Sequence, residues 1–62
     1  MSARKVFVIL NKIKDKGNLS FEDIKSIIDR SVNKTNEFIN SMIERGLIEK
    51  VNSNEYILKS KL

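Results

Sequence analysis

The side chains best suited to recognition chemistry lie between positions 33 and 44, where short polar residues recur every three or four positions. At helical spacing they share one face, which consists of Asn33, Lys34, Glu37, Asn40, Ser41 and Glu44, with Asn36 at its edge. Such side chains suit the edges of nucleic-acid bases, because Asn can bind adenine bidentately, Lys can reach guanine and Glu can accept from cytosine. Any solvated helix shows a similar face, and Glu37 and Glu44 would oppose phosphates. The spacing therefore predicts a recognition face, with a plain solvent-exposed face as the alternative.

Residues for catalysis and metal binding are scarce. The sequence has no histidine and no cysteine, and it has neither a glycine-rich phosphate loop nor a pair of carboxylates that a pocket could hold apart. A zinc ion would have to rely on carboxylates alone. We therefore expect no enzymatic activity, no cofactor, no metal site and no small-molecule substrate.

Length and charge narrow the class of partner. A chain of 62 residues, 40% of them hydrophobic, supports one small core. Its net charge of +4 favours an anionic partner, of which nucleic acid is the commonest. The longest apolar run, Val6 to Leu10, is too short to span a bilayer and lacks the cleavage site of a signal peptide. We expect a cytoplasmic protein with no membrane partner.

The first segment that must position these residues is a helix over about residues 3–15. Its apolar side chains fall on one buried stripe, which consists of Val6, Ile9, Leu10 and Ile13. Phe7 flanks that stripe, and Val8 lies on the opposite side. Val8 is either a tolerated apolar residue on the surface or, together with Phe7, part of a self-association face.

A second helix is predicted over about residues 21–30. Ser20 has the type of an N-cap residue, and Asp23 follows three positions later to complete a capping box. Leu19 can pack on Ile24, and it can also pair with the later hairpin through a single bridge. The helix is expected to run to about Asp29 or Arg30.

A third helix is predicted over about residues 33–45, with Ser31 or Asn33 as its cap. The residues expected to point inward are Val32, Thr35, Ile39, Met42 and Ile43. Gly46 supplies the positive φ that ends such a helix, and Leu47 can then fold back onto Met42 in a Schellman ending.

After Gly46 the periodicity changes to that of a β-hairpin over about residues 47–59. "LIEKV" and "EYILK" are short β-rich runs separated by "NSN", whose residues tolerate tight turns. A lone hairpin is marginal in water, so it must pack on the helices. The residues available for that packing are Leu47, Ile48, Val51, Tyr56 and Leu58. Tyr56 and the phenylalanines Phe7, Phe21 and Phe38 are expected in the core or at its edge.

This order of elements resembles the winged helix-turn-helix superfamily, in particular its small archaeal, bacterial and viral transcription regulators. The resemblance covers about Ala3 to Leu58 and depends on "LSFEDIKSII", on "SVNKTNEFINSMIERGLIE" with its Gly-Leu-Ile ending, and on "YILK" as the returning strand. It implies a mainly α fold with a small β-hairpin, in which residues 1–62 form a single winged domain. An archaeal or viral source fits the composition.

The resemblance implies a double-stranded DNA-binding regulator whose third helix enters the major groove. The helix residues it nominates are Asn33, Lys34, Asn36, Glu37, Asn40 and Ser41. The residues nominated for the backbone or minor groove are Ser20, Arg30, Lys50, Asn52, Ser53 and Asn54, and further attraction is expected from Arg4, Lys5, Lys59 and Lys61. A homodimer on paired half-sites is expected, with Phe7 and Val8 as its first candidate surface. The alternative is a winged-helix module that binds protein instead of DNA.

Overall fold

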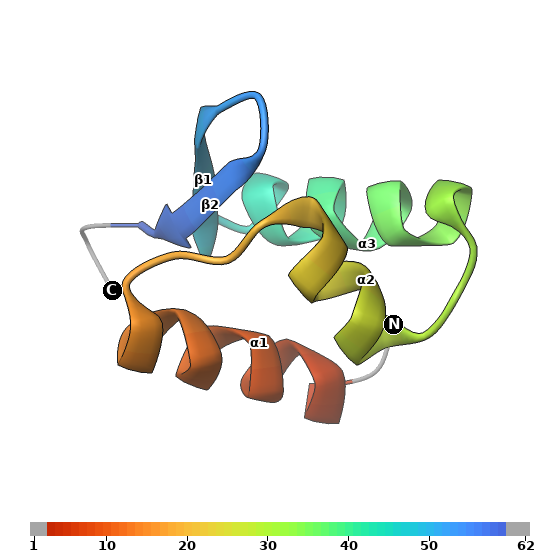
Figure 1. Ribbon diagram of the computed structural model, residues 1–62, viewed down its shortest axis with the longest axis horizontal. Helices are drawn as coiled ribbons and strands as arrows, with labels where there is room; N and C mark the ends of the chain where they lie inside the picture. Colours follow the sequence, from red (N-terminus) through yellow and green to blue (C-terminus); the bar gives the residue numbers. More distant parts are fainter. Residues whose placement is uncertain (1–2, 60–62) are drawn as a thin grey trace.

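The protein consists of three helices followed by a two-stranded antiparallel hairpin (Figure 1), seen in a computed structural model that describes residues 3–59. The elements are α1 (Ala3–Lys16), α2 (Phe21–Ile28), α3 (Val32–Glu44), β1 (Ile48–Asn52) and β2 (Glu55–Leu58). This mainly α fold with a β-hairpin wing confirms the predicted fold class. Among the described residues, every helix is too short or too polar to cross a membrane. Lys61 lies outside the described residues.

Helix α2 lies between the other two helices. Helix α1 packs on α2 and β2, whereas α3 packs on α2 and β1, so α1 and α3 lie on opposite sides of the molecule (Figure 1). Each of these helices therefore has an outer face that points away from the other.

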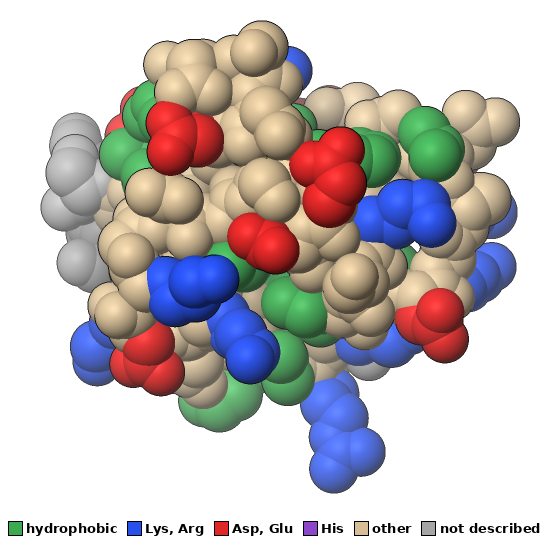
Figure 2. Space-filling model, in the orientation of Figure 1, with side chains coloured by type: hydrophobic (Ala, Val, Ile, Leu, Met, Phe, Trp, Pro, Cys, Tyr) green, Lys and Arg blue, Asp and Glu red, His purple; other side chains and the backbone are tan. Residues whose placement is uncertain are grey.

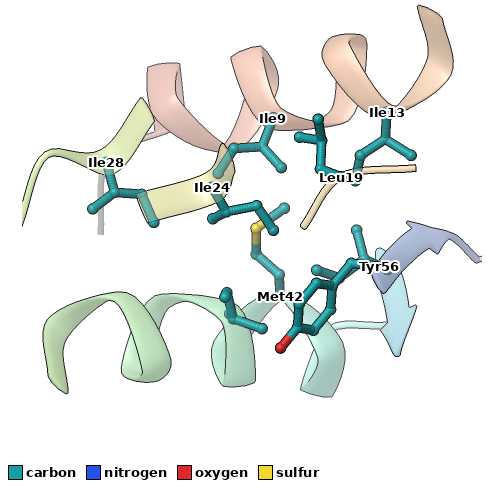
Figure 3. Close-up of a cluster of buried hydrophobic side chains, with 9 residues drawn as sticks. Ile9, Ile13, Leu19, Ile24, Ile28, Met42 and Tyr56 are labelled. Carbon is teal, nitrogen blue, oxygen red and sulfur yellow. The ribbon is translucent and has the colours of Figure 1, made fainter. Parts of the chain in front are cut away.

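The core is made by every element and by the α1–α2 connection. Its buried apolar residues are Ile9, Ile13, Leu19, Ile24, Ile28, Ile39, Met42, Ile48 and Tyr56. Figure 3 shows Met42 reaching from α3 into the centre of this cluster, toward Ile24 of α2. Thr35 is also fully buried, and its hydroxyl donates to the Ser31 carbonyl at 2.9 Å. The one buried polar side chain among the described residues is therefore satisfied.

Helix α2 begins as predicted and ends early. The Ser20 hydroxyl accepts from the Asp23 amide at 3.1 Å, and the Asp23 carboxylate accepts from the Ser20 amide at 3.2 Å, which confirms the capping box. The helix ends at Ile28, so the expected end at Asp29 or Arg30 was wrong. Asp29 is left-handed, with φ of 57°, and a left-handed residue cannot continue a right-handed helix.

Helix α3 begins at Val32, one residue earlier than predicted, because Ser31 and not Asn33 is its cap. As the first residue of the helix, Val32 lies where the chain enters from the α2–α3 connection, and its side chain is exposed. The prediction that it points inward was wrong. At the other end, the Leu47 amide donates to the Met42 carbonyl at 3.0 Å and the Gly46 amide to the Ile43 carbonyl at 2.9 Å. These two bonds, with φ of +75° at Gly46, confirm the Schellman ending.

The hairpin is attached to the helices through Tyr56. Its backbone pairs with Leu19 through two hydrogen bonds of 3.0 and 2.9 Å, which confirms the predicted bridge. The strand register shifts between Lys50 and Asn52, so Val51 is the extra residue of a β-bulge. Val51 is 49% exposed, and the prediction that it packs on the helices was wrong, because Val51 is three residues from the buried Ile48 and strand alternation places the two side chains on opposite faces.

Candidate nucleic-acid interface

The outer face of α3 is the one that the sequence predicts. Thr35, Ile39 and Met42 are buried on the inner side. On the outer side Asn33, Lys34, Asn36, Glu37 and Asn40 are exposed and Ser41 is half-buried. The predicted helix residues therefore share one accessible surface.

This outer face divides into two parallel stripes. Asn33, Asn36 and Asn40 follow one another at intervals of three and four residues, which places three side-chain amides in a row along the helix. Lys34, Glu37 and Ser41 form the second stripe, on the side that faces the end of α2. One stripe is thus neutral and rich in hydrogen-bonding groups, and the other carries charge.

The charged stripe forms one wall of an open groove of about 360 Å³. The groove is lined by Lys5, Ile28, Arg30, Lys34, Glu37, Phe38 and Ser41. Three cations from α1, from the α2–α3 connection and from α3 therefore surround a floor with two apolar side chains. A groove with more positive than negative side chains suits an anionic group.

Two of the three cations in this groove contact other groups of the protein. Lys34 Nζ lies 3.6 Å from a Glu37 carboxylate oxygen, and both side chains are well exposed, so the pair contributes little to stability. Lys5 Nζ donates to the Ile28 carbonyl at 2.5 Å. A cation at that position satisfies a terminal carbonyl of α2 and complements the negative end of its dipole. Lys5 thus joins α1 to the end of α2 while lining the groove.

Ser20, at the N-terminus of α2, was a predicted contact for the DNA backbone, and it is already engaged in hydrogen bonds within the protein. Ser20 and Asp23 bond to each other in the capping box, and the Phe21 amide donates to the Asn54 side-chain oxygen at 3.0 Å. The amide and then the hydroxyl of Ser20 hold the pKa of Asp23 below its usual value. A carboxylate stabilised in its charged form disfavours a phosphate beside it.

The turn of the hairpin is folded onto the same helix end. The Asn54 side chain accepts from Phe21 and donates to Glu22 at 3.1 Å, while the Asn54 amide donates to Asn52 Oδ1 at 2.9 Å. The Asn52 amide group also donates to Glu55. Asn52 and Asn54, both predicted contacts at the tip of the wing, therefore bond within the protein.

The remaining predicted residues of the hairpin are exposed. Lys50 Nζ lies 5.9 Å from the centre of the Tyr56 ring, within the range of a cation–π interaction. Ser53 is exposed at the turn. Of the other predicted contacts, Arg30 lies with Lys34 in the groove at the C-terminal end of α2. Ser20 lies with Asn54 at the N-terminal end of the same helix.

Helix α1 carries the two residues predicted as a self-association face. Phe7 is 66% exposed and Val8 36% exposed. The expectation that Phe7 lies in the core or at its edge was wrong, because the core of α1 is centred on Ile9 and Ile13, and Phe7 points well away from both.

Sequence reasoning gave little weight to two residues of the groove, Lys5 and Phe38. Lys5 and Ile28 are 23 residues apart in the sequence. Their contact depends on how α1 crosses α2, and no local sequence signal predicts that crossing. Phe38 follows Glu37 and precedes the buried Ile39, and this position at the border of the inner stripe was the available signal.

Comparison of the chain with protein-family models, with curated proteins and with solved structures found no match. The described residues contain no group of three or more Asp or Glu side chains that could hold a metal ion. What the site offers is therefore hydrogen bonding from three asparagines and positive charge in the adjoining groove.

Proposed function

We propose that the protein binds double-stranded DNA as a small regulator of the winged-helix type, with the outer face of α3 in the major groove. The observation that carries the proposal is the position of the basic groove directly beside the asparagine stripe. Base edges in the major groove offer donors and acceptors to Asn side chains, while the neighbouring phosphates require cations. The asparagine stripe of α3 and the adjoining basic groove match these two needs.

The part of the groove around Arg30 and Lys34 lies at the N-terminal end of α3, which favours a phosphate. Arg30 and Lys34 flank the first turn, where the helix dipole is positive. The N-terminus of α2 is a poorer candidate, because Glu22 and Asp23 lie in its first turn and Asn54 covers its first amide. We therefore assign phosphate contacts to Arg30 and Lys34, and we assign Lys5 to joining α1 to the end of α2 and Asn54 to holding the wing.

The proposal is tested by fluorescence anisotropy of a labelled random-sequence duplex across a salt series. We expect binding that weakens with salt, because neutralising each phosphate releases counterions. Replacing Lys34 or Arg30 by Ala should weaken binding to every sequence. It should also reduce the slope of log K against log[salt] by about 0.9 for each phosphate that the variant no longer neutralises.

Lys14→Ala is the matched control, since it removes one exposed lysine from α1, on the other side of the molecule from α3. Its affinity should fall far less than that of Lys34→Ala. If the duplex does not bind at low salt, or if Lys34→Ala and Lys14→Ala behave alike, the α3 face is not the binding surface and the proposal fails.

Specific recognition is tested by selecting a binding site and then replacing Asn40 by Ala. Removal of one bidentate interaction with adenine should cost about 1–3 kcal/mol of discrimination at one base pair, which relaxes the preference there. Two copies on half-sites one helical turn apart would supply the specificity that one small module lacks. Sedimentation of the complex with the selected duplex then counts the copies, and one copy would contradict the homodimer.

A further inference from the structure

The positive charge of this protein is concentrated on α1 and not on α3. Helix α1 carries five cations, Arg4, Lys5, Lys12, Lys14 and Lys16, against the single carboxylate of Asp15. Its net charge of +4 equals that of the whole chain. Helix α3 carries one lysine and two glutamates, a net charge of −1. Figure 2 shows several Lys and Arg side chains over the lower half of the molecule, where Figure 1 places α1.

The outer face of α1 combines this charge with exposed apolar side chains. Its residues fall at spacings of three and four along the helix, and they are Arg4, Phe7, Val8, Asn11 and Lys12. We call them the α1 patch. Phe7 and Val8 are two of the four large apolar residues that are exposed among the described positions. An open groove of about 350 Å³ continues from Val8 along the same helix and is lined by Asn11, Lys12, Asp15 and Lys16.

We propose that the α1 patch is a docking site for an acidic amphipathic segment of a partner protein. Apolar side chains of that segment would cover Phe7 and Val8, and its carboxylates would face Arg4 and Lys12. Aromatic residues ringed by polar groups are typical energetic centres of interfaces, and charge of the opposite sign speeds association and selects the partner.

DNA, a lipid surface or a second copy of this chain would each complement only part of the α1 patch. DNA phosphates would pair with the lysines and leave Phe7 and Val8 without an apolar partner. A lipid surface would meet only these two apolar residues, because the apolar stripe of α1 that includes Ile9 and Ile13 is buried in the core. A second copy of α1 would bring another predominantly positive helix against this one. An acidic amphipathic segment matches both the charge and the apolar pair.

Because the α1 patch and the outer face of α3 lie on opposite sides of α2, both can be occupied at once. The protein would then hold its α3 ligand on one side and an acidic protein segment on the other. The inference about α1 does not depend on what α3 binds, so each can fail separately.

The test is a titration of ¹⁵N-labelled protein with a synthetic helical peptide that has Leu on one face and Glu and Asp elsewhere. A second peptide with Lys at every acidic position is the charge control. We expect shifts of the α1 backbone amides with the acidic peptide and none with the basic one. Phe7→Ser should weaken binding of the acidic peptide about tenfold or more, as truncation of an interface aromatic does.

Val51→Ser is the matched control variant, because it also removes an exposed apolar side chain, here from the wing. It should bind the acidic peptide with unchanged affinity. The inference is overturned if the acidic peptide does not bind, if both peptides bind equally, or if the Phe7→Ser and Val51→Ser variants bind alike. It is also overturned if phosphatidylglycerol vesicles or a duplex shift the α1 amides more than the peptide does, or if the protein alone forms a dimer that Phe7→Ser dissociates.

Discussion

Asn54 shows how much the role of one residue depends on a partner that is distant in sequence. By type it suits a tight turn, and its position at the tip of a hairpin suggested contact with DNA. In the structure its side chain accepts from the Phe21 amide and donates to Glu22, more than 30 positions away. It thus satisfies one of the amides that the first turn of α2 cannot pair within the helix.

Replacing Asn54 by Ala should therefore destabilise the protein by about 1–2 kcal/mol, because the variant lacks two hydrogen bonds and one of them satisfied a helix terminus. The measurement is the midpoint of urea unfolding. Ser53→Ala, on the same exposed turn, is the control and should change the free energy of unfolding by less than about 0.5 kcal/mol. Equal midpoints for the two variants would show that the wing is not held by Asn54.

The capping box makes stability depend on pH through Asp23. Hydrogen bonds from Ser20 lower the pKa of this carboxyl in the folded protein, so its contribution to stability is fully present above the unfolded pKa. That contribution is lost as the pH falls through the folded pKa. Ser20→Ala should cost about 1 kcal/mol at neutral pH.

The measurement is urea unfolding of the parent, Ser20→Ala and Asp23→Asn between neutral and strongly acidic pH. We expect the stability advantage of the parent over Asp23→Asn to shrink as the solution is acidified, since only the parent titrates at this position. A constant difference across that range would mean that the Asp23 carboxylate does not contribute through its charge.

At the scale of elements, local sequence signals predict where the helices begin and end better than they predict which surfaces the packed helices form. The capping box and the Schellman ending each follow from residues within one or two turns, and the structure confirms both. The predicted bridge of Leu19 is also confirmed, although its partner Tyr56 is distant in sequence. The early end of α2 at a left-handed Asp29 was missed, because Asp offers only a weak signal for that conformation compared with Gly.

Long-range features were harder to predict. Periodicity placed the outer face of α3 correctly, but the basic groove requires the crossing of α1 over α2, which brings Lys5 beside Arg30 and Lys34. The register shift at Val51 is a second such feature, because a five-residue strand carries no sequence signal for a β-bulge. Sequence therefore predicted the helix that offers a candidate site, whereas the groove beside it is set by packing between elements.

The end of α3 gives a prediction at this scale. Gly46 has φ of +75°, and a Cβ added there would have no atom within 4 Å. Gly46→Ala should therefore cost about 1 kcal/mol, from backbone strain alone and without a clash. Gly46→Asn should cost less, because Asn tolerates the left-handed conformation. Thermal unfolding of the two variants checks the order, and a larger loss for Asn than for Ala would contradict it.

For the molecule as a whole, a small core means a small total free energy of unfolding. A domain of this size, with no disulfide, is expected to have a free energy of unfolding of about 3–5 kcal/mol. Every element contributes to the same buried cluster, and Met42 lies in its centre between α3 and α2 (Figure 3). Loss of one central side chain should therefore affect the entire fold and not one element.

Met42→Ala should cost about 2–5 kcal/mol, because it removes buried apolar atoms and leaves a cavity. Since that cost matches the expected total, we predict a protein largely unfolded at 25 °C, visible as loss of helical circular dichroism and of dispersed amide resonances. Met42→Leu nearly conserves volume and should cost less than about 1.5 kcal/mol, so it should remain folded. A Met42→Ala variant that stays fully folded would mean that the truncation costs less than the free energy of unfolding, and Met42 would then contribute less to the shared core than its central position implies.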